Sequence, residues 1–376
     1  MNSFNFEFQI KTKIKFGSGK RKVLPQTAAD LGCRNLMIVA DEGIKNAGIL
    51  DMITVELDGK INYAIFDKVK PDPTIDIIDQ GVKFAIENSA DTLLAVGGGS
   101  PIDSAKAIRA ACQQKELNEK NSRHIPLITV PTTSGSGSEV TKAVVITDEK
   151  TQNKFSAVDE SLTPDITVVD PELTRTLPPH LTASSGMDAL SHCIESYVSQ
   201  DAVLPFEMIA TKGIEMVNTY LRPAVGNGNN MKAREGMSLA SLFGGIALSN
   251  CGLGLVHAVA HPLGGRFKIP HGLANTILLP HVMKFNVISN PAKFANIARL
   301  MGVNISNMTE MEAARRAADE VKKLTADIGL PTGLKEFGVD SFEEVADLAL
   351  EEELMLRSNP RPVKREDIIK ILKDAY

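Results

Sequence analysis

Apolar and polar positions follow two different rhythms along the chain, and the change falls near residue 181. Before it, short apolar runs alternate with helical patterns, and Thr74 is placed to cap a helix that continues through Ile86. The short runs are predicted strands at 36–40, 62–66, 92–96, 127–130, 143–147 and 166–169. Near the N-terminus, four apolar residues alternate with polar ones and predict a half-buried strand: Phe4, Phe6, Phe8 and Ile10. Strands that alternate with helices indicate βαβ units on a mostly parallel sheet.

The second half of the chain shows long helical periodicities and few β-branched runs. The predicted helices include 182–200, 204–221, 233–248, 291–301 and 309–328. We therefore expect an α/β domain over 1–181 and an all-helical domain over 182–376. The least polar stretch, 237–265, contains Asn250, His257, His261 and several glycines. It is predicted to be buried helix and not a membrane span.

Composition and charge exclude several classes of protein. Hydrophobic residues make up 43% and charged residues 23% of the 376 positions, as in globular proteins, which excludes a disordered chain. The net charge of −5 argues against a nucleic-acid partner and against electrostatic attachment to an anionic membrane. The four cysteines form no CxxC pair, and the N-terminus lacks the pattern of a signal peptide. A reducing cytoplasm fits these features.

A run of three glycines is the first candidate binding feature. In LLAVGGGSPIDSAKAI, an apolar run ends, Gly97, Gly98 and Gly99 follow, and a helical pattern begins. Ser100 is a suitable N-cap, and Pro101 suits the first helical position. Glycines let backbone N–H groups approach a ligand, and a helix N-terminus attracts anions, so a phosphate is the natural ligand. A tight turn without a ligand is the alternative, and the GxGxxG fingerprint is absent.

Two further features follow predicted strands of the same half. The segment PTTSGSGSE, residues 131–139, offers several hydroxyl groups and two glycines. Asp41 closes the strand at 36–40, where an acid can accept hydrogen bonds from ribose and repel a 2′-phosphate. Each has an ordinary alternative, a polar loop and a surface-turn aspartate. In open α/β sheets, however, ligands bind at the carboxyl ends of the strands.

Five potential metal ligands occur in two segments of the helical half. Asp188 and His192 are four residues apart, as are His257 and His261, and His271 follows. Such spacing places each pair on one helical face. Their neighbours are mostly Ala, Leu, Gly and Val, where five polar groups are difficult to satisfy without a shared partner. The sequence therefore predicts a divalent metal, with Zn²⁺, Fe²⁺, Mn²⁺ and Co²⁺ all compatible; spacing does not say which four residues bind.

Four segments together resemble the iron-containing, group III alcohol dehydrogenases: GGGSPIDSAKA, PTTSGSGSEVT, GMDALSHCIESY and HAVAHPLGGRFKIPHG. The resemblance spans essentially the whole chain. It implies an N-terminal α/β domain that binds a dinucleotide and a C-terminal all-helical domain that holds a metal. It also implies an NAD(H)-dependent alcohol dehydrogenase or aldehyde reductase with Fe²⁺ as the expected metal and Zn²⁺ as the second choice. The expected substrate is a small alcohol or aldehyde, and the expected assembly is a homo-oligomer, a dimer.

The resemblance also implies a role for each matching residue. The implied metal ligands are Asp188, His192, His257 and His271, and the implied cofactor-binding residues are Asp41, Gly98, Gly99, Ser100, Thr132, Thr133 and Lys154. His261 would lie beside the metal and the nicotinamide as a catalytic residue and not as a ligand. Gly98, Gly99 and Ser100 would hold the pyrophosphate, and Asp41 would favour NAD(H). Asp72 stands where many relatives carry Asn.

Other functions remain open at this point. A glycerol-dehydrogenase-like polyol oxidoreductase of the same fold, a maleylacetate reductase, a lyase on the dehydroquinate-synthase-like fold and a non-catalytic scaffold are the alternatives. The ligand, glycine-loop and lysine positions disfavour the scaffold. Arg266 could meet an anionic substrate, although such arginines are more often solvated.

Overall fold

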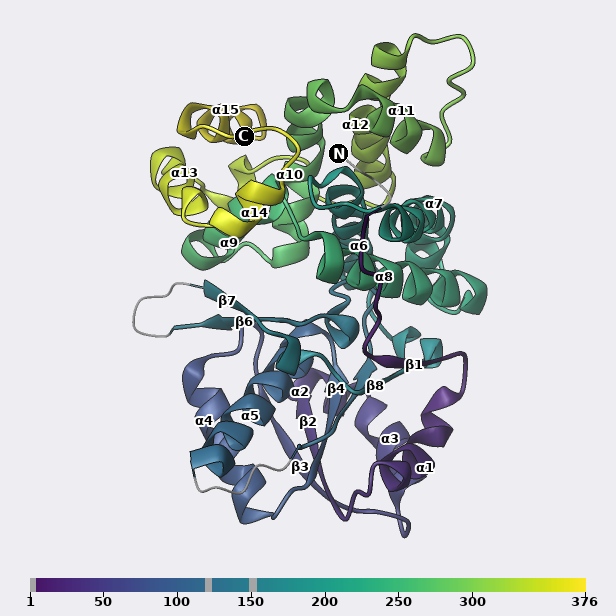
Figure 1. The fold of residues 1–376 in the computed structure, drawn as a ribbon. Helices are drawn as coiled ribbons and strands as arrows, with labels where there is room; N and C mark the ends of the chain where they lie inside the picture. The colour runs from purple at the N-terminus through teal and green to yellow at the C-terminus, as the bar shows by residue number, and fades with distance from the viewer. Residues whose placement is uncertain (1–4, 119–123, 149–153) are drawn as a thin grey trace. The chain divides into compact units, whose positions relative to one another are not determined.

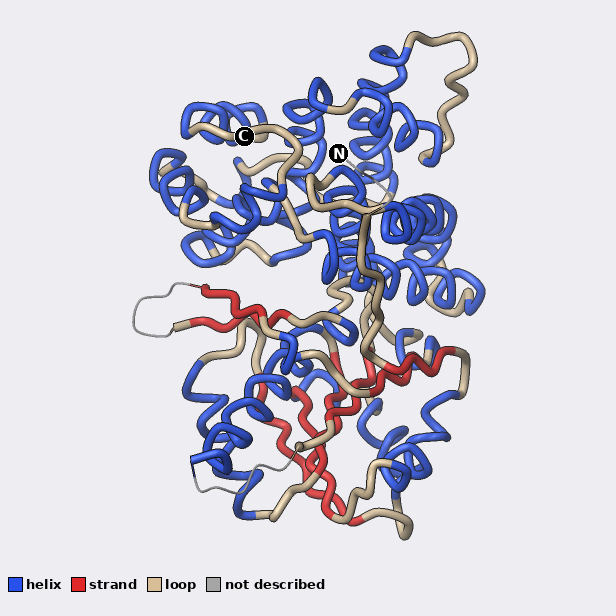
Figure 2. The backbone as a smooth tube through the Cα atoms, in the orientation of Figure 1, coloured by secondary structure: helices blue, strands red, loops and turns tan. Residues whose placement is uncertain are grey.

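The computed structural model describes residues 5–118, 124–148 and 154–376, which form two compact units. The α/β unit contains Gln9–Thr133 and Gly137–Leu177, and the helical unit contains Met1–Phe8, Ser134–Ser136 and Pro178–Tyr376. Figure 1 shows the elements of each unit, and Figure 2 shows that the strands (red) belong to the α/β unit. A short loop segment, Ser134–Ser136, thus belongs to the helical unit although both of its flanks belong to the other.

The α/β unit is built on a six-stranded, fully parallel sheet in the order β1-β8-β5-β4-β2-β3. Its strands are β1 (Lys13–Phe16), β2 (Asn35–Asp41), β3 (Asn62–Val69), β4 (Thr92–Gly97), β5 (Leu127–Pro131) and β8 (Ile166–Val169). Its helices are α1 (Leu24–Asp30), α2 (Glu42–Asn46), α3 (Ile49–Leu57), α4 (Ile75–Glu87) and α5 (Gly99–Asn118). The predicted α/β class with a mostly parallel sheet is confirmed.

Alternation along the central strands explains why helices cover both faces of the sheet. Leu93 and Ala95 of β4 pack in one apolar cluster with residues of α4 and α5. Leu94 and Val96, which point the opposite way, pack with residues of α1 and α3. Every residue of β4 is buried, as is usual for a parallel strand covered on both faces. The predicted N-cap is also confirmed, since the Thr74 side chain accepts from the Ile77 N–H.

Two strand predictions need correction. The strand at 143–147 exists as β6 (Ala143–Thr147), but it pairs antiparallel with β7 (Lys154–Val158) in a separate two-stranded sheet. The N-terminal alternating segment forms no strand over its described residues, 5–11; Phe4 lies outside them. Instead, Phe8 stacks on Phe206 of the helical unit, with ring centroids 4.9 Å apart. The alternation indicates one apolar side but does not specify its partner: Phe8 contacts a helix, and both Phe6 and Phe8 remain exposed.

The helical unit is made of α6 to α15 around a single large apolar cluster. Its helices are α6 (Pro179–Val198), α7 (Leu204–Gly226), α8 (Met231–Cys251), α9 (Leu255–Phe267), α10 (His271–Asn286), α11 (Pro291–Leu300), α12 (Glu310–Asp327), α13 (Phe342–Leu350), α14 (Glu353–Ser358) and α15 (Arg365–Asp374). The residues that the structure describes also include six short 3₁₀ helices: Lys20–Val23, Ser138–Val140, Glu160–Leu162, Pro171–Thr174, Val287–Ser289 and Lys335–Phe337. The five long helices predicted after residue 181 are all present.

The least polar stretch is divided between α8 and α9, which are bent by 104° at the break between them. Among the described residues, no helix alone has the length and apolar character needed to cross a membrane, and this bent pair meets the criterion only when taken together. Its histidines are buried inside the helical unit.

Candidate active site

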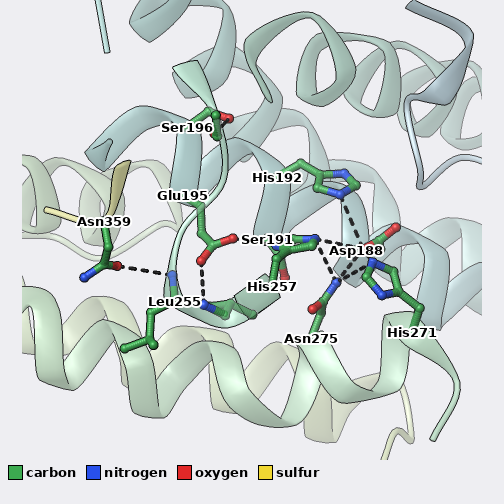
Figure 3. A network of polar contacts seen from close by, with 12 residues as sticks. Asp188, Ser191, His192, Glu195, Ser196, Leu255, His257, His271, Asn275 and Asn359 are labelled. Carbon is green, nitrogen blue, oxygen red and sulfur yellow. Dashed lines mark hydrogen bonds and ion pairs between the residues drawn. The ribbon is translucent and has the colours of Figure 1, made fainter. Parts of the chain in front are cut away.

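Four polar side chains from three helices converge inside the helical unit. Asp188 and His192 come from α6, His257 from α9, and His271 is the first residue of α10. One ligand atom from each lies within 4.8 Å of the others, and Figure 3 shows the four side chains directed at one another. Asp188 Oδ1 is 3.6 Å from His192 Nε2, 3.8 Å from His257 Nε2 and 3.5 Å from His271 Nε2. His271 is 37% exposed, and the other three are buried.

Close packing of α10 on α6 brings His271 to this cluster. A Cβ atom on Gly272 would come within 2.5 Å of the Ser184 carbonyl oxygen, so only glycine allows this approach. The helical spacing of Asp188 and His192 supplies the other half of the cluster from one face of α6. Four of the five candidate ligands in the sequence therefore meet in this cluster. The fifth, His261, lies one helical turn beyond His257 on α9.

Hydrogen bonds on the far side of two imidazole rings direct their other nitrogen into the cluster. His257 Nδ1 lies 2.5 Å from Glu195 Oε2, and Glu195 Oε1 accepts from the Val256 N–H at 2.7 Å. His192 Nδ1 lies 3.2 Å from the carbonyl oxygen of Gly135. These acceptors favour a proton on Nδ1 and leave the Nε2 lone pair for a cation.

Three of the four side chains have the protonation state that a cation site needs, and the fourth, His257, carries an extra proton. Burial alone would raise the pKa of Asp188, but the neighbouring imidazoles, His192 foremost, bring that pKa well below its usual range. Burial lowers the pKa of His192 and lowers the pKa of His271 to about 3. At His257 burial also favours the neutral ring, but Glu195 beside it raises the pKa to about 9. A carboxylate and neutral imidazoles are the forms that bind metals, and binding at His257 would release a proton.

The donor set therefore fits a divalent metal of the Fe²⁺ or Zn²⁺ type. One carboxylate and three imidazoles provide four ligands to the metal, and none of them is a thiolate. A catalytic metal also needs a position for substrate oxygen, and the partial exposure of His271 marks the side of the cluster that is open.

His261 has a different partner from the four clustered side chains. Its Nδ1 lies 2.7 Å from Glu352 Oε1, the residue that precedes α14. Its ring centroid is 5.9 Å from that of His271, so it lies beside the cluster. Sequence reasoning missed three residues here: Glu195, Asn275 and Glu352. Glu195 and Glu352 have partners 62 and 91 positions away, and Asn275 contacts Asp188 across 87 positions. Asn275 also contacts His257 and His271 at 18 and 4 positions, and only the last of these spacings is a local helical one.

The glycine run lies at the junction of β4 and α5 in the α/β unit. Gly97 has a φ of 153°, a conformation that favours glycine, and a Cβ on Gly98 would lie 3.2 Å from the Thr133 side chain. Helix α5 begins at Gly99, so its N-cap position is Gly98 and Ser100 lies in its first turn; the prediction of Ser100 as the N-cap is wrong by two residues. The junction still presents a partly exposed helix N-terminus beside the backbone of the glycines, and such a surface suits a phosphate.

Thr132 and Thr133 follow β5 directly. The Thr132 N–H donates to the Gly97 carbonyl oxygen at 3.0 Å, which ties the two loops together. Its hydroxyl is buried and has no hydrogen-bond partner among the described residues, so it is available to a ligand. The glycine junction and these threonines are compatible with a pyrophosphate group.

Four other residues singled out in the sequence have mixed outcomes. Asp41 ends β2 and caps α2, because its Oδ1 accepts from the Ile44 N–H at 2.9 Å. Lys154 begins β7, but its side chain lies outside the described residues. Asp72 has a left-handed backbone, φ 56°, which Asn and Asp tolerate better than most residues. Arg266 pairs with Glu344 at 3.0 Å and its side chain is 41% exposed, which fits the solvated role that such arginines more often have.

Comparisons with known proteins place the chain in a family. Residues 11–171 match the family described as "Iron-containing alcohol dehydrogenase", and residues 182–376 match "Fe-containing alcohol dehydrogenase family, C-terminal". The chain is 36% identical to the NAD-dependent methanol dehydrogenase of Bacillus methanolicus, over 98% of this chain and 99% of the relative. It is 36% identical to the lactaldehyde reductase of Escherichia coli (strain K12), over 96% and 97% of the two chains.

Solved structures agree with this placement. A crystal structure of 1,3-propanediol oxidoreductase superposes with a TM-score of 0.94 at 37% identity and covers 99% of this chain and 100% of that one. The metal-type donor cluster and the glycine junction are thus found on a shared fold. The chain belongs to the iron-containing alcohol dehydrogenase family and is an NAD-dependent oxidoreductase of alcohols or aldehydes.

Proposed function

We propose that the chain interconverts a small alcohol and its aldehyde, with the metal held by Asp188, His192, His257 and His271. The observation that carries this proposal is the convergence of these four side chains within 4.8 Å of one another. When bound, a divalent metal supplies Lewis acidity to the substrate oxygen, and NAD(H) takes or delivers a hydride. The family name favours Fe²⁺, but Zn²⁺ competes well for nitrogen and oxygen ligands.

The residues around these groups bind and orient them. Glu195 and the Gly135 carbonyl hold two ligand rings in the binding orientation. Gly98, Gly99 and Ser100 hold the pyrophosphate at the start of α5, while Thr132 and Thr133 line the same surface. Lys154 hydrogen-bonds the nicotinamide ribose, and Asp41 favours NAD(H) over NADP(H). Two observations support these cofactor roles. Gly98 lies so close to the Thr133 side chain that a Cβ would be 3.2 Å from it, and the buried Thr132 hydroxyl has no hydrogen-bond partner among the described residues.

His261 is proposed as a catalytic residue that does not bind the metal. Its Nδ1 is held by Glu352, which leaves Nε2 available to accept or donate the proton of the substrate hydroxyl, directly or through water. We also propose the domain limits expected from the sequence: residues 1–181 bind the cofactor, and residues 182–376 bind the metal.

The assembly and location are also proposals. We expect a homo-oligomer, a dimer, because Phe6 and Phe8 of the N-terminal segment remain 41% and 48% exposed and a second copy could cover them. Light scattering of the full chain tests this. We expect a cytoplasmic enzyme without nucleic-acid or membrane partners, in keeping with its net charge of −5 and its four separated cysteines.

Turnover with controlled metal content tests the function. Dialysis against EDTA should abolish NADH-dependent reduction of short aldehydes, and Fe²⁺ or Zn²⁺ should restore it. A panel of neutral, hydroxylated and anionic aldehydes would then identify the substrate and separate this activity from that of a polyol oxidoreductase. Full turnover by protein shown to be metal-free would overturn the proposal.

A further inference from the structure

Asn275 contacts three of the four clustered side chains. It lies one helical turn after His271 on α10, and its side chain is fully buried. Its amide nitrogen Nδ2 lies 2.8 Å from Asp188 Oδ1, 3.0 Å from His257 Nε2 and 3.1 Å from His271 Nε2, as Figure 3 shows. One amide group therefore faces the same atoms that would hold a metal.

The three contacts are not equivalent in their chemistry. An amide nitrogen has two hydrogens to donate, and Asp188 is an anion with several lone pairs. The Nε2 atom of a neutral imidazole has one lone pair, which either accepts a hydrogen or binds a cation. A cation and the amide can therefore share Asp188, but they are alternatives at His257 and His271. The contact with Asp188 is also charge-assisted and the shortest of the three.

The other end of the amide shows what sets its orientation. Oδ1 of Asn275 is buried and has no hydrogen-bond partner among the residues that the structure describes. A buried polar atom without a partner is unfavourable. The orientation is therefore determined by the contacts of Nδ2 with the cluster and not by the needs of the amide oxygen.

We propose that Asn275 is a positioning residue of the metal centre, which acts through Asp188. It holds the Asp188 carboxylate toward the three imidazoles and exchanges its two histidine contacts for the cation. This inference rests on the proposed metal site. Residues that hydrogen-bond to metal ligands commonly change metal affinity by about 10–100-fold when they are replaced.

The test measures zinc affinity of the full-length, demetallated chain by competition with a chromophoric chelator. Asn275→Ala should bind zinc about 10–100-fold more weakly than the wild type. Asn275→Leu keeps more of the side-chain volume but has no hydrogen-bond donor, so it should show the same loss of zinc affinity. This variant replaces Asn275→Ala in the test if the alanine variant does not fold. Asp188→Ala removes one proposed ligand, so a loss of zinc binding in this variant shows that the measured affinity belongs to this site.

Asn286→Ala is the matched control. Asn286 is buried at the end of the same helix and exchanges hydrogen bonds of 2.8 and 2.9 Å with Asn359. Its replacement should lower the melting temperature while zinc affinity is unchanged. Wild-type affinity in both Asn275 variants, or an equal loss in Asn286→Ala, overturns the positioning role. A wild type that binds no zinc would instead overturn the metal site, and the inference with it.

Discussion

The carboxylate of Glu195 lies 2.5 Å from Nδ1 of His257, and both side chains are buried. Glu195 is on the same helix, α6, as Asp188 and His192, and it orients His257, which comes from α9. Glu195 favours a proton on Nδ1 of His257, the nitrogen that faces away from the cluster. The same contact directs Nε2 of His257 toward the cluster.

Replacing Glu195 should therefore weaken the metal site. Glu195→Gln keeps the volume but removes the charge that favours the Nδ1 proton. We expect zinc affinity to fall about 10–100-fold, as measured by chelator competition. Glu207→Gln is a suitable control, because Glu207 pairs with Lys293 at 2.7 Å and is not one of the clustered residues. Unchanged zinc affinity in Glu195→Gln would contradict the orienting role.

The two histidines of α9 should separate in a pair of variants. His257→Ala should lose the metal, because it removes one of the four clustered donors. His261→Ala should keep the metal and slow turnover by at most about 10²-fold, since water can replace a proton relay. Glu352→Gln should give a smaller loss in the same direction, because Glu352 holds the His261 ring at 2.7 Å. Metal content and turnover, measured side by side, decide this; the opposite pattern for the two histidines refutes the assignment.

Gly98 should be intolerant of a side chain for a reason specific to cofactor binding. A Cβ at this position lies 3.2 Å from the Thr133 side chain and on the surface proposed for the pyrophosphate. Gly98→Val should raise the dissociation constant for NADH, measured by fluorescence titration, while metal content stays near normal. Gly226→Ala is the control, since a Cβ there meets nothing within 4 Å. Normal NADH binding by Gly98→Val would place the pyrophosphate elsewhere.

Asp41 should set the preference between the two dinucleotides. Asp41→Gly removes the charge that repels a 2′-phosphate and should raise kcat/KM with NADPH relative to NADH. Because Asp41 also caps α2, Asp41→Asn is the cleaner change: asparagine caps helices well and carries no charge. Glu42→Gln removes the neighbouring charge as a control. A wild type that already prefers NADPH would show that Asp41 does not have this role.

Local patterns predicted the fold and much of the candidate site, and long-range partners account for what they missed. The spacing of Asp188 and His192 is a property of one helix, so it can be recognised without a structure. Glu195, Asn275 and Glu352 are ordinary helix or loop residues until distant segments meet them. The cap predicted at Ser100 lies two residues earlier, at Gly98, because α5 begins within the glycines. The strand β6 was predicted, but its pairing with β7 was not, since periodicity does not specify a partner.

The location of the metal is the most direct test of this account. Crystals of the full chain loaded with zinc can be measured at the zinc absorption edge for an anomalous difference map. The account predicts one strong peak in the helical unit, about 2.0–2.2 Å from Asp188 and from Nε2 of His192, His257 and His271. A peak elsewhere, or none at these four residues in protein that turns over, would contradict it.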